Sequence, residues 1–229
     1  MTGAPLHGPL AVAALILSLV GLPVVLGVFR MIREDTLDPL PRLALWGVTA
    51  AALWVTAAAW PAMLQRISPT LPSMATLGWG IAGAAAVFLL WGPLQWIQQR
   101  FGAQPLEETE QYRKIAGRRF AYRVFLVVTA GVVEEVLYRG VAIGTGSVLL
   151  GGVGWAAGLS LVVFTGAHWD WDRSHLFTVF GAGAVLTLLF VASGDLLACV
   201  LAHSLVDGVG LLLAPAMVAR RDAEGEAAP

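Results

Sequence analysis

Long, uninterrupted apolar stretches are the feature that most limits what this chain can fold into. A transmembrane α-helix needs about 20 consecutive, mostly apolar residues, and stretches of that length recur along the sequence. The sequence is therefore typical of an all-α, polytopic transmembrane helical bundle. We predict about seven spans, within a range of six to eight: residues 9–29, 43–63, 74–97, 122–143, 147–168, 176–193 and 195–217.

Composition supports the membrane assignment. Of the 229 residues, 58% are hydrophobic and 13% are charged, whereas soluble domains carry about 25% charged residues. The formal net charge of −1 provides no basic excess, so we expect the lipid bilayer and not nucleic acid as a partner. Abundant alanine and glycine, with a single lysine among many arginines, are typical of a bacterial protein, and we expect a multi-pass protein of the plasma membrane.

Basic residues predict the orientation of the bundle. With the N-terminus outside, 12 of the 14 basic residues fall in inner loops or in the C-terminal tail. Arg66 falls outside and Arg139 lies within a span. Because loops rich in arginine and lysine stay on the cytoplasmic side, we predict an outer N-terminus and a cytoplasmic C-terminus.

The chain divides into three parts by this reading. Residues 1–119 hold three spans and a polar cytoplasmic connector, 120–217 a catalytic membrane core, and 218–229 a disordered tail. The first three spans have no ionisable residue in their centres, so we expect the chemistry in the later spans. The fifth span is the least regular, because clustered glycines predict a broken or re-entrant stretch before Trp155.

Three ionisable residues interrupt the fourth predicted span. A charge at the bilayer centre is costly, which makes such residues functional candidates. Glu135 and Arg139 are one helical turn apart and can pair, whereas Glu134 points about 100° away and is left for other chemistry. The alternative is that all three form one buried ionic lock.

Two histidines follow in later spans. His168 comes one turn after Phe164 and falls near the inner end of its span, unless that helix begins near Trp155 or the following loop dips inward. His203 and Asp207 are one turn apart, so the carboxylate can orient the imidazole. The alternative for His168 is a histidine at the membrane interface without a catalytic role. The alternative for His203 and Asp207 is a structural hydrogen bond between helices. We assign no catalytic role to the other ionisable residues, which fall at predicted helix ends or in loops: His7, Asp170, Asp172, His175 and Asp195.

These segments together form a recognisable pattern of three motifs. They are Glu134-Glu135-x-x-x-Arg139, Phe164-x-x-x-His168 and His203-x-x-x-Asp207. In this order, inside apolar spans, they resemble the signature of the CAAX protease and bacteriocin-processing (CPBP, or Abi) family of intramembrane endopeptidases. The resemblance covers roughly residues 120 to 210. The last motif position takes Asn in many members and Asp here.

The resemblance implies a role for each motif residue. Glu134 and His168 would activate a water that attacks a peptide bond of a membrane-associated peptide or protein. His203 with Asp207 would bind and polarise the oxyanion or help to position that water, and Glu135, Arg139 and Phe164 would be supporting residues. Catalytic water activation needs an acceptor within about 3 Å, and an oxyanion needs a donor such as histidine.

The sequence leaves alternatives open for the cofactor and for the function. We expect no metal, because no His-Glu-x-x-His is present; a metal-dependent enzyme would instead bind Zn²⁺ through Glu134, His168 and His203. A proton- or ion-coupled transporter is the competing functional class, since intramembrane acids and histidines also build relays. The lack of an internal repeat argues against it. A non-catalytic scaffold that retains the fold is the third alternative.

Overall fold

The computed structural model describes residues 8–32, 39–63, 72–100, 110–169 and 175–215, and these residues form helices without any strand. The elements in chain order are α1 (Gly8–Ile32), α2 (Pro39–Ala59), α4 (Met74–Arg100), α5 (Glu110–Ala116), α6 (Phe120–Thr129), η2 (Ala130–Ile143), α7 (Gly144–Leu149), α8 (Val153–Gly166), α9 (His175–Ser193), α10 (Leu196–Gly208) and η3 (Val209–Leu213). The all-α class is confirmed.

Five helical segments within the described residues are long and apolar enough to cross a membrane: Gly8–Ile32, Pro39–Ala59, Met74–Arg100, His175–Ser193 and Leu196–Leu213. Their outward faces carry large apolar side chains; Trp54, Leu89 and Leu188 are 72%, 78% and 68% exposed. Exposed apolar surface on this scale marks contact with lipid. Each of the five overlaps a predicted span, whereas the predicted count of seven is not confirmed.

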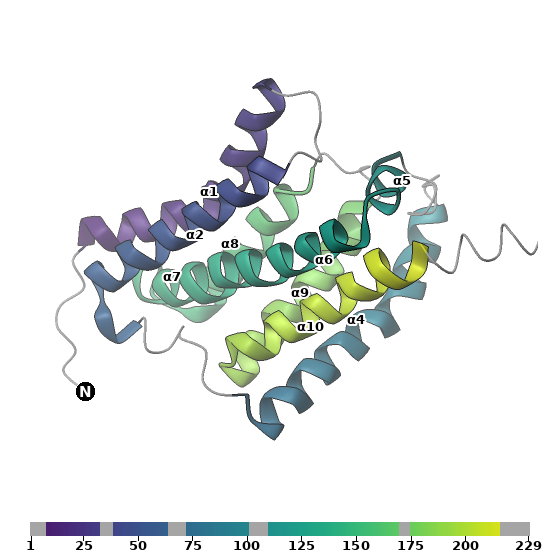
Figure 1. Cartoon of the computed structure of the whole chain (residues 1–229). Helices are drawn as coiled ribbons and strands as arrows, with labels where there is room; N and C mark the ends of the chain where they lie inside the picture. The colour runs from purple at the N-terminus through teal and green to yellow at the C-terminus, as the bar shows by residue number, and fades with distance from the viewer. Residues whose placement is uncertain (1–7, 33–38, 64–71, 101–109, 170–174, 216–229) are drawn as a thin grey trace, which may run out of the picture.

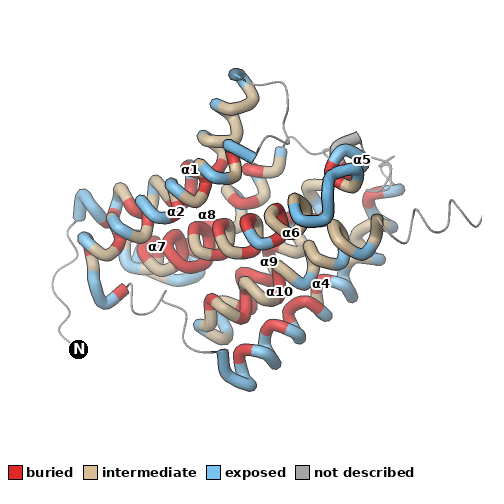
Figure 2. Tube along the Cα trace, in the orientation of Figure 1, coloured by how far each residue is buried: buried red, intermediate tan, exposed pale blue. Residues whose placement is uncertain are grey.

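The fourth predicted span corresponds to a continuous helical rod in which α6 runs directly into η2 and then α7. η2 is a π-helix of 14 residues, much longer than the single-turn π-bulges usual inside α-helices, which often mark functional sites. Ten of its residues are buried. The rod is the most enclosed part of the molecule, visible as the red stretch between α6 and α7 in Figure 2.

The fifth predicted span is broken, as its glycines indicated. α7 ends at Leu149, a turn follows with Gly151 at φ +72°, and α8 begins only at Val153. A positive φ is readily adopted by glycine. The 14 residues of α8 extend about 21 Å at 1.5 Å per residue, less than the roughly 30 Å of hydrocarbon. His168 follows this short helix and lines the cavity described below.

The buried rod lies between two groups of helices (Figure 1). α1 and α2 pack together on one side, while α4, α9 and α10 pack together on the other. η2 contacts α1, α2, α8 and α10. Gly131 allows the approach of α10, because a Cβ at this position would overlap the Ser204 hydroxyl. Small residues permit such close helix packing in membranes, and here the contact brings the third motif of the site toward the first.

Candidate active site

The first motif forms a buried ion pair on η2. Arg139 Nη1 lies 2.9 Å from Glu135 Oε1, and neither side chain is more than 1% exposed. Arg139 also donates from Nη2 to the Gly183 carbonyl of α9 at 3.1 Å. Its guanidinium lies 4.4 Å from the centroid of the Phe164 ring, a cation–π distance. These contacts tie η2 to α8 and α9.

Glu135 has a second partner that the sequence spacing did not indicate. His203 Nδ1 lies 2.7 Å from the same Oε1 that accepts from Arg139. A paired carboxylate oxygen is an acceptor, so we assign the hydrogen to Nδ1 of His203. The other nitrogen, Nε2, then faces Asp207 Oδ2 at 3.5 Å. The expected partner Asp207 is present, but the shorter contact orienting the ring comes from Glu135.

Glu134 lies beside His168. The His168 Nδ1 is 2.9 Å from the Phe164 carbonyl oxygen, and because a carbonyl only accepts, Nδ1 must carry the hydrogen. Nε2 is thereby directed at Glu134 Oε2, 3.9 Å away. This separation is too long for a direct hydrogen bond. The side chains are 18% and 13% exposed, so the pair is unlike the sealed Glu135 and Arg139.

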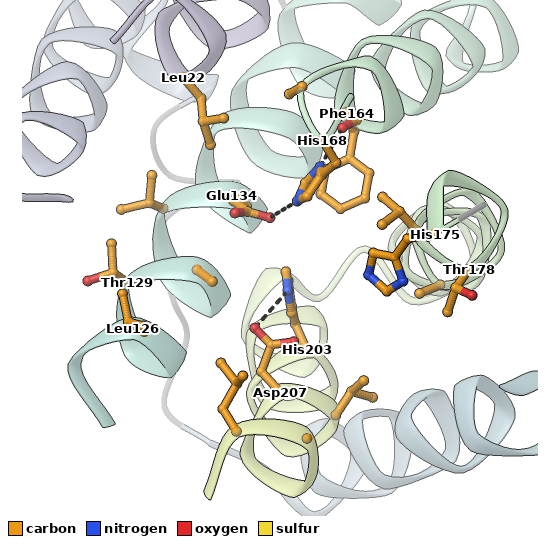
Figure 3. Close-up of a pocket in the computed structure, with 18 of the residues that line it drawn as sticks. Leu22, Leu126, Thr129, Glu134, Phe164, His168, His175, Thr178, His203 and Asp207 are labelled. Carbon is orange, nitrogen blue, oxygen red and sulfur yellow. Dashed lines mark hydrogen bonds and ion pairs between the residues drawn. The ribbon is translucent and has the colours of Figure 1, made fainter. Parts of the chain in front are cut away.

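Both acid and histidine pairs open into one cavity of about 230 Å³. Figure 3 shows Glu134 with His168 on one side and His203 with Asp207 on the other. The volume is well above the ~10–15 Å³ that one water occupies on this measure. The structure therefore brings Glu134, His168, His203 and Asp207 to one chamber and keeps Glu135 and Arg139 behind its wall.

The gap between the Glu134 and His168 side chains can hold a water molecule. Polar groups separated by more than 3.5 Å are commonly bridged by water. A water within about 3 Å of both atoms can donate one hydrogen to Glu134 Oε2 and the other to His168 Nε2. Its oxygen lone pairs would then point away from both acceptors. Such a water is oriented and activated as a nucleophile.

A zinc site fits the side-chain geometry poorly. Among the described residues, no group of three His, Cys, Asp or Glu side chains is arranged to hold a metal ion. His203, one of the three residues named for a zinc site, has both ring nitrogens directed at carboxylates. We therefore derive no catalytic step through a metal.

Two arginines and one histidine in the cavity wall were not predicted as site residues. Arg30 of α1, Arg42 of α2 and His175 at the start of α9 all line the chamber. The arginines were explained by the positive-inside pattern and the histidine by solvation at a helix end. No local motif distinguishes them, because only the packing of α1, α2 and α9 around η2 directs them inward. Asp170 and Asp172, to which the sequence assigned no chemistry, lie outside the described residues.

The fold describes a multi-pass membrane protein with a buried chamber lined by acids and histidines. Residues 117–209 match the family model for Rce1-like proteins, described as type II CAAX prenyl endopeptidases. All three motifs lie within the match. The membrane core of this chain is thus similar to the CAAX protease family, as its motifs indicated. No curated protein and no solved structure matches the chain significantly.

Proposed function

We propose that the protein is an intramembrane endopeptidase that hydrolyses a peptide bond of a membrane-associated peptide or protein without a metal. The observation that carries the proposal is the pair of acceptors, Glu134 Oε2 and His168 Nε2, 3.9 Å apart in the wall of a cavity. The family match supports the reaction class. The donor geometry described above supports the metal-free form.

The reaction begins with water held between these acceptors. Its oxygen attacks the carbonyl carbon of the scissile bond, and one of its protons passes to Glu134, with His168 fixing the orientation of the water. The C=O double bond becomes a tetrahedral oxyanion. His203 has a carboxylate at each ring nitrogen, Glu135 at Nδ1 and Asp207 at Nε2, so we assign a hydrogen to both nitrogens. Nε2 is then the hydrogen-bond donor for this oxyanion in the chamber.

Collapse of the tetrahedral species completes the hydrolysis. The C–N bond breaks, and the proton held by Glu134 passes to the leaving nitrogen. One product ends in a new carboxylate and the other begins with a new amine, and Glu134 returns to its starting state. The balance needs only water and peptide, so no cofactor is required.

The bundle around this site is proposed to have seven spans, an outer N-terminus and a cytoplasmic C-terminus in a bacterial plasma membrane. The two spans beyond the five long apolar helices would be the rod that contains η2 and the short helix α8. Charges on the rod are compatible with a span because Glu135 and Arg139 neutralise each other.

The test compares membranes that contain wild type with membranes that contain Glu134→Ala, His168→Ala or His203→Ala. We expect new protein N- and C-termini with wild type only, detected by mass spectrometry of the membrane fraction. Asp195→Asn is the matched control, because Asp195 caps α10 away from the cavity and Asn caps equally well. Identical termini in all samples would remove the peptidase proposal. Activity that disappears with a chelator and returns with Zn²⁺ would remove its metal-free form.

A further inference from the structure

The short helix α5 forms part of the wall of the catalytic cavity. Tyr112 and Ile115, which share one face of this helix, line the cavity and are each 4% exposed. Arg113 and Lys114, between them in the sequence, are exposed. α5 is therefore amphipathic, with an apolar face toward the chamber and a charged face toward the outside.

The apolar face of α5 is docked on α6 and η3. Ile115 packs in one cluster with Leu126 of α6, and Leu211 of η3 packs against that cluster. The Tyr112 hydroxyl donates a hydrogen bond to the Gly210 carbonyl at 3.1 Å. Leu126, Gly210 and Leu211 line the cavity as well. The surface that α5 covers thus belongs to the catalytic chamber.

The carbonyl next to Gly210 is held by a different helix. Arg123 of α6 donates from Nη1 to the Leu211 carbonyl at 2.9 Å. Arginine commonly caps the last carbonyls of a helix in this way, and α6 is continuous with the buried rod. Arg123 therefore holds η3 independently of α5. The hydrogen bond of Tyr112 can break without releasing the helix that carries His203 and Asp207.

The size and the connection of α5 allow it to move as a unit. It has seven residues, too few for a helix that is stable alone. Residues 117–119 separate it from α6, with extended backbone at Arg119, and Figure 1 shows it at the start of α6. Elements docked through a small buried surface open at low free energy, and hinges lie at the ends of such elements.

We propose that α5 is a lid on the catalytic cavity, latched by the hydrogen bond from Tyr112 to the Gly210 carbonyl. With the lid docked, Tyr112 and Ile115 complete the wall of the chamber. With the lid open, this part of the chamber is uncovered, and a segment of the substrate can reach Glu134 and His168. The role in substrate entry rests on the proposed peptidase function, whereas the opening itself is a property of the fold.

The first experiment measures opening without using enzymatic activity. Val206 lines the cavity, so Val206→Cys places a thiol inside it, while the native Cys199 is buried. In phosphatidylcholine nanodiscs, the rate of labelling by a water-soluble maleimide is followed by mass spectrometry. Adding Tyr112→Phe should raise this rate about two- to tenfold, the factor for one net hydrogen bond. Arg113→Gln, on the exposed face of α5, is the control and should leave the rate unchanged.

The second experiment locks the lid and measures cleavage. Ile115→Cys and Leu126→Cys together place two thiols across the contact between α5 and α6. A short bifunctional thiosulfonate joins them through bonds that dithiothreitol breaks. The substrate is a pool of N-palmitoylated dodecapeptides of random sequence, analysed by mass spectrometry. Cleavage should fall by about tenfold or more in the linked protein, because the open state is no longer populated, and should return on reduction. The two single-cysteine variants, treated identically, should lose far less.

Either of two results would overturn the lid. The first is an unchanged labelling rate in Tyr112→Phe, which would mean that the hydrogen bond does not hold α5 closed. The second is a linked protein that cleaves as fast as its reduced form, a comparison within one variant that does not depend on the folding of another. Absence of cleavage by wild type would instead count against the proposed function, and the labelling rates would still decide whether α5 opens.

Discussion

Glu134 and Glu135 are adjacent in sequence, each lies near a histidine, and their surroundings differ completely. Glu135 accepts from Arg139 at 2.9 Å and from His203 at 2.7 Å, with no exposed side-chain surface. Glu134 stands 3.9 Å from His168 at the edge of a cavity. The first carboxylate is held by two fixed partners on its Oε1, whereas the second leaves space for a water. The difference separates a residue that holds the site together from one that can react.

Helical geometry helps to produce this difference. Successive residues of any helix point in different directions, so a Glu-Glu pair on η2 necessarily presents one acid to the interior and the other elsewhere. Gly131 brings α10 close enough for His203 to reach Glu135. Since α8 ends at Gly166, His168 lies beside Glu134. Three separate features of the backbone thus place Glu135 among fixed partners and Glu134 at the cavity.

The largest expected effect is on catalysis, from Glu134→Gln. Removing a general base typically costs about 10²–10⁴ in rate, and here kcat should fall by that amount with KM nearly unchanged. The thermal unfolding temperature in detergent should stay close to that of wild type, because Glu134 has no short hydrogen bond to lose. Peptide-pool cleavage and calorimetry measure the two quantities. A variant that retains full activity would make the cavity carboxylate dispensable and reverse the assignment.

The next largest effect is expected on stability, from Arg139→Met in the buried ion pair. It leaves Glu135 as a buried charge without its cation, and breaking a buried pair from one side costs about 3–5 kcal/mol. We expect a large drop in the free energy of unfolding, measured by chemical denaturation in mixed micelles.

The double variant Glu135→Met/Arg139→Met sharpens this prediction. It removes both charges, so much of the stability should return, whereas activity should stay low because His203 has lost the acceptor of its Nδ1 hydrogen. Recovery of activity together with stability would show that Glu135 does not orient His203.

A smaller effect is expected from Gly131→Ala, which tests the contact between the two motif helices. The added methyl group overlaps the Ser204 hydroxyl, and overpacking of this kind costs about 1–3 kcal/mol. Ser204→Ala in the same chain removes the overlapping oxygen and should restore both stability and cleavage. If the single variant is as stable and active as wild type, close approach of η2 and α10 is not what positions His203.

Much of this arrangement could be predicted from local sequence. Hydropathy located the five long apolar helices, and four-residue spacing predicted the pairing of Glu135 with Arg139 and the proximity of His203 to Asp207. Local spacing carries no information about contacts between distant helices. The bond between His203 and Glu135, 68 residues apart, depends on how η2 and α10 pack.

Because local spacing does not predict how distant helices pack, the basic residues of the cavity wall were not predicted as site residues. Arg42 obeys the positive-inside pattern whether it faces water or the chamber, so its position required the packing of α2 against the rod. The long π-helix was also unforeseen, because π-hydrogen bonding leaves no residue pattern comparable to the apolar period of an α-helix. Glycine clustering, in contrast, did indicate the break that shortens α8.

The smallest effect is expected from Asp207→Asn, the second carboxylate beside His203. Asp207 is 28% exposed and 3.5 Å from Nε2, a loose contact compared with that of Glu135. An Asn oxygen can still accept from this nitrogen, and the loss of a single modest hydrogen bond corresponds to less than about tenfold in rate. We therefore expect kcat/KM within that factor of wild type, with Asp195→Asn as the control. A much larger loss would mean that the charge of Asp207 is needed in the transition state, and the cavity would then contain two reactive carboxylates instead of one.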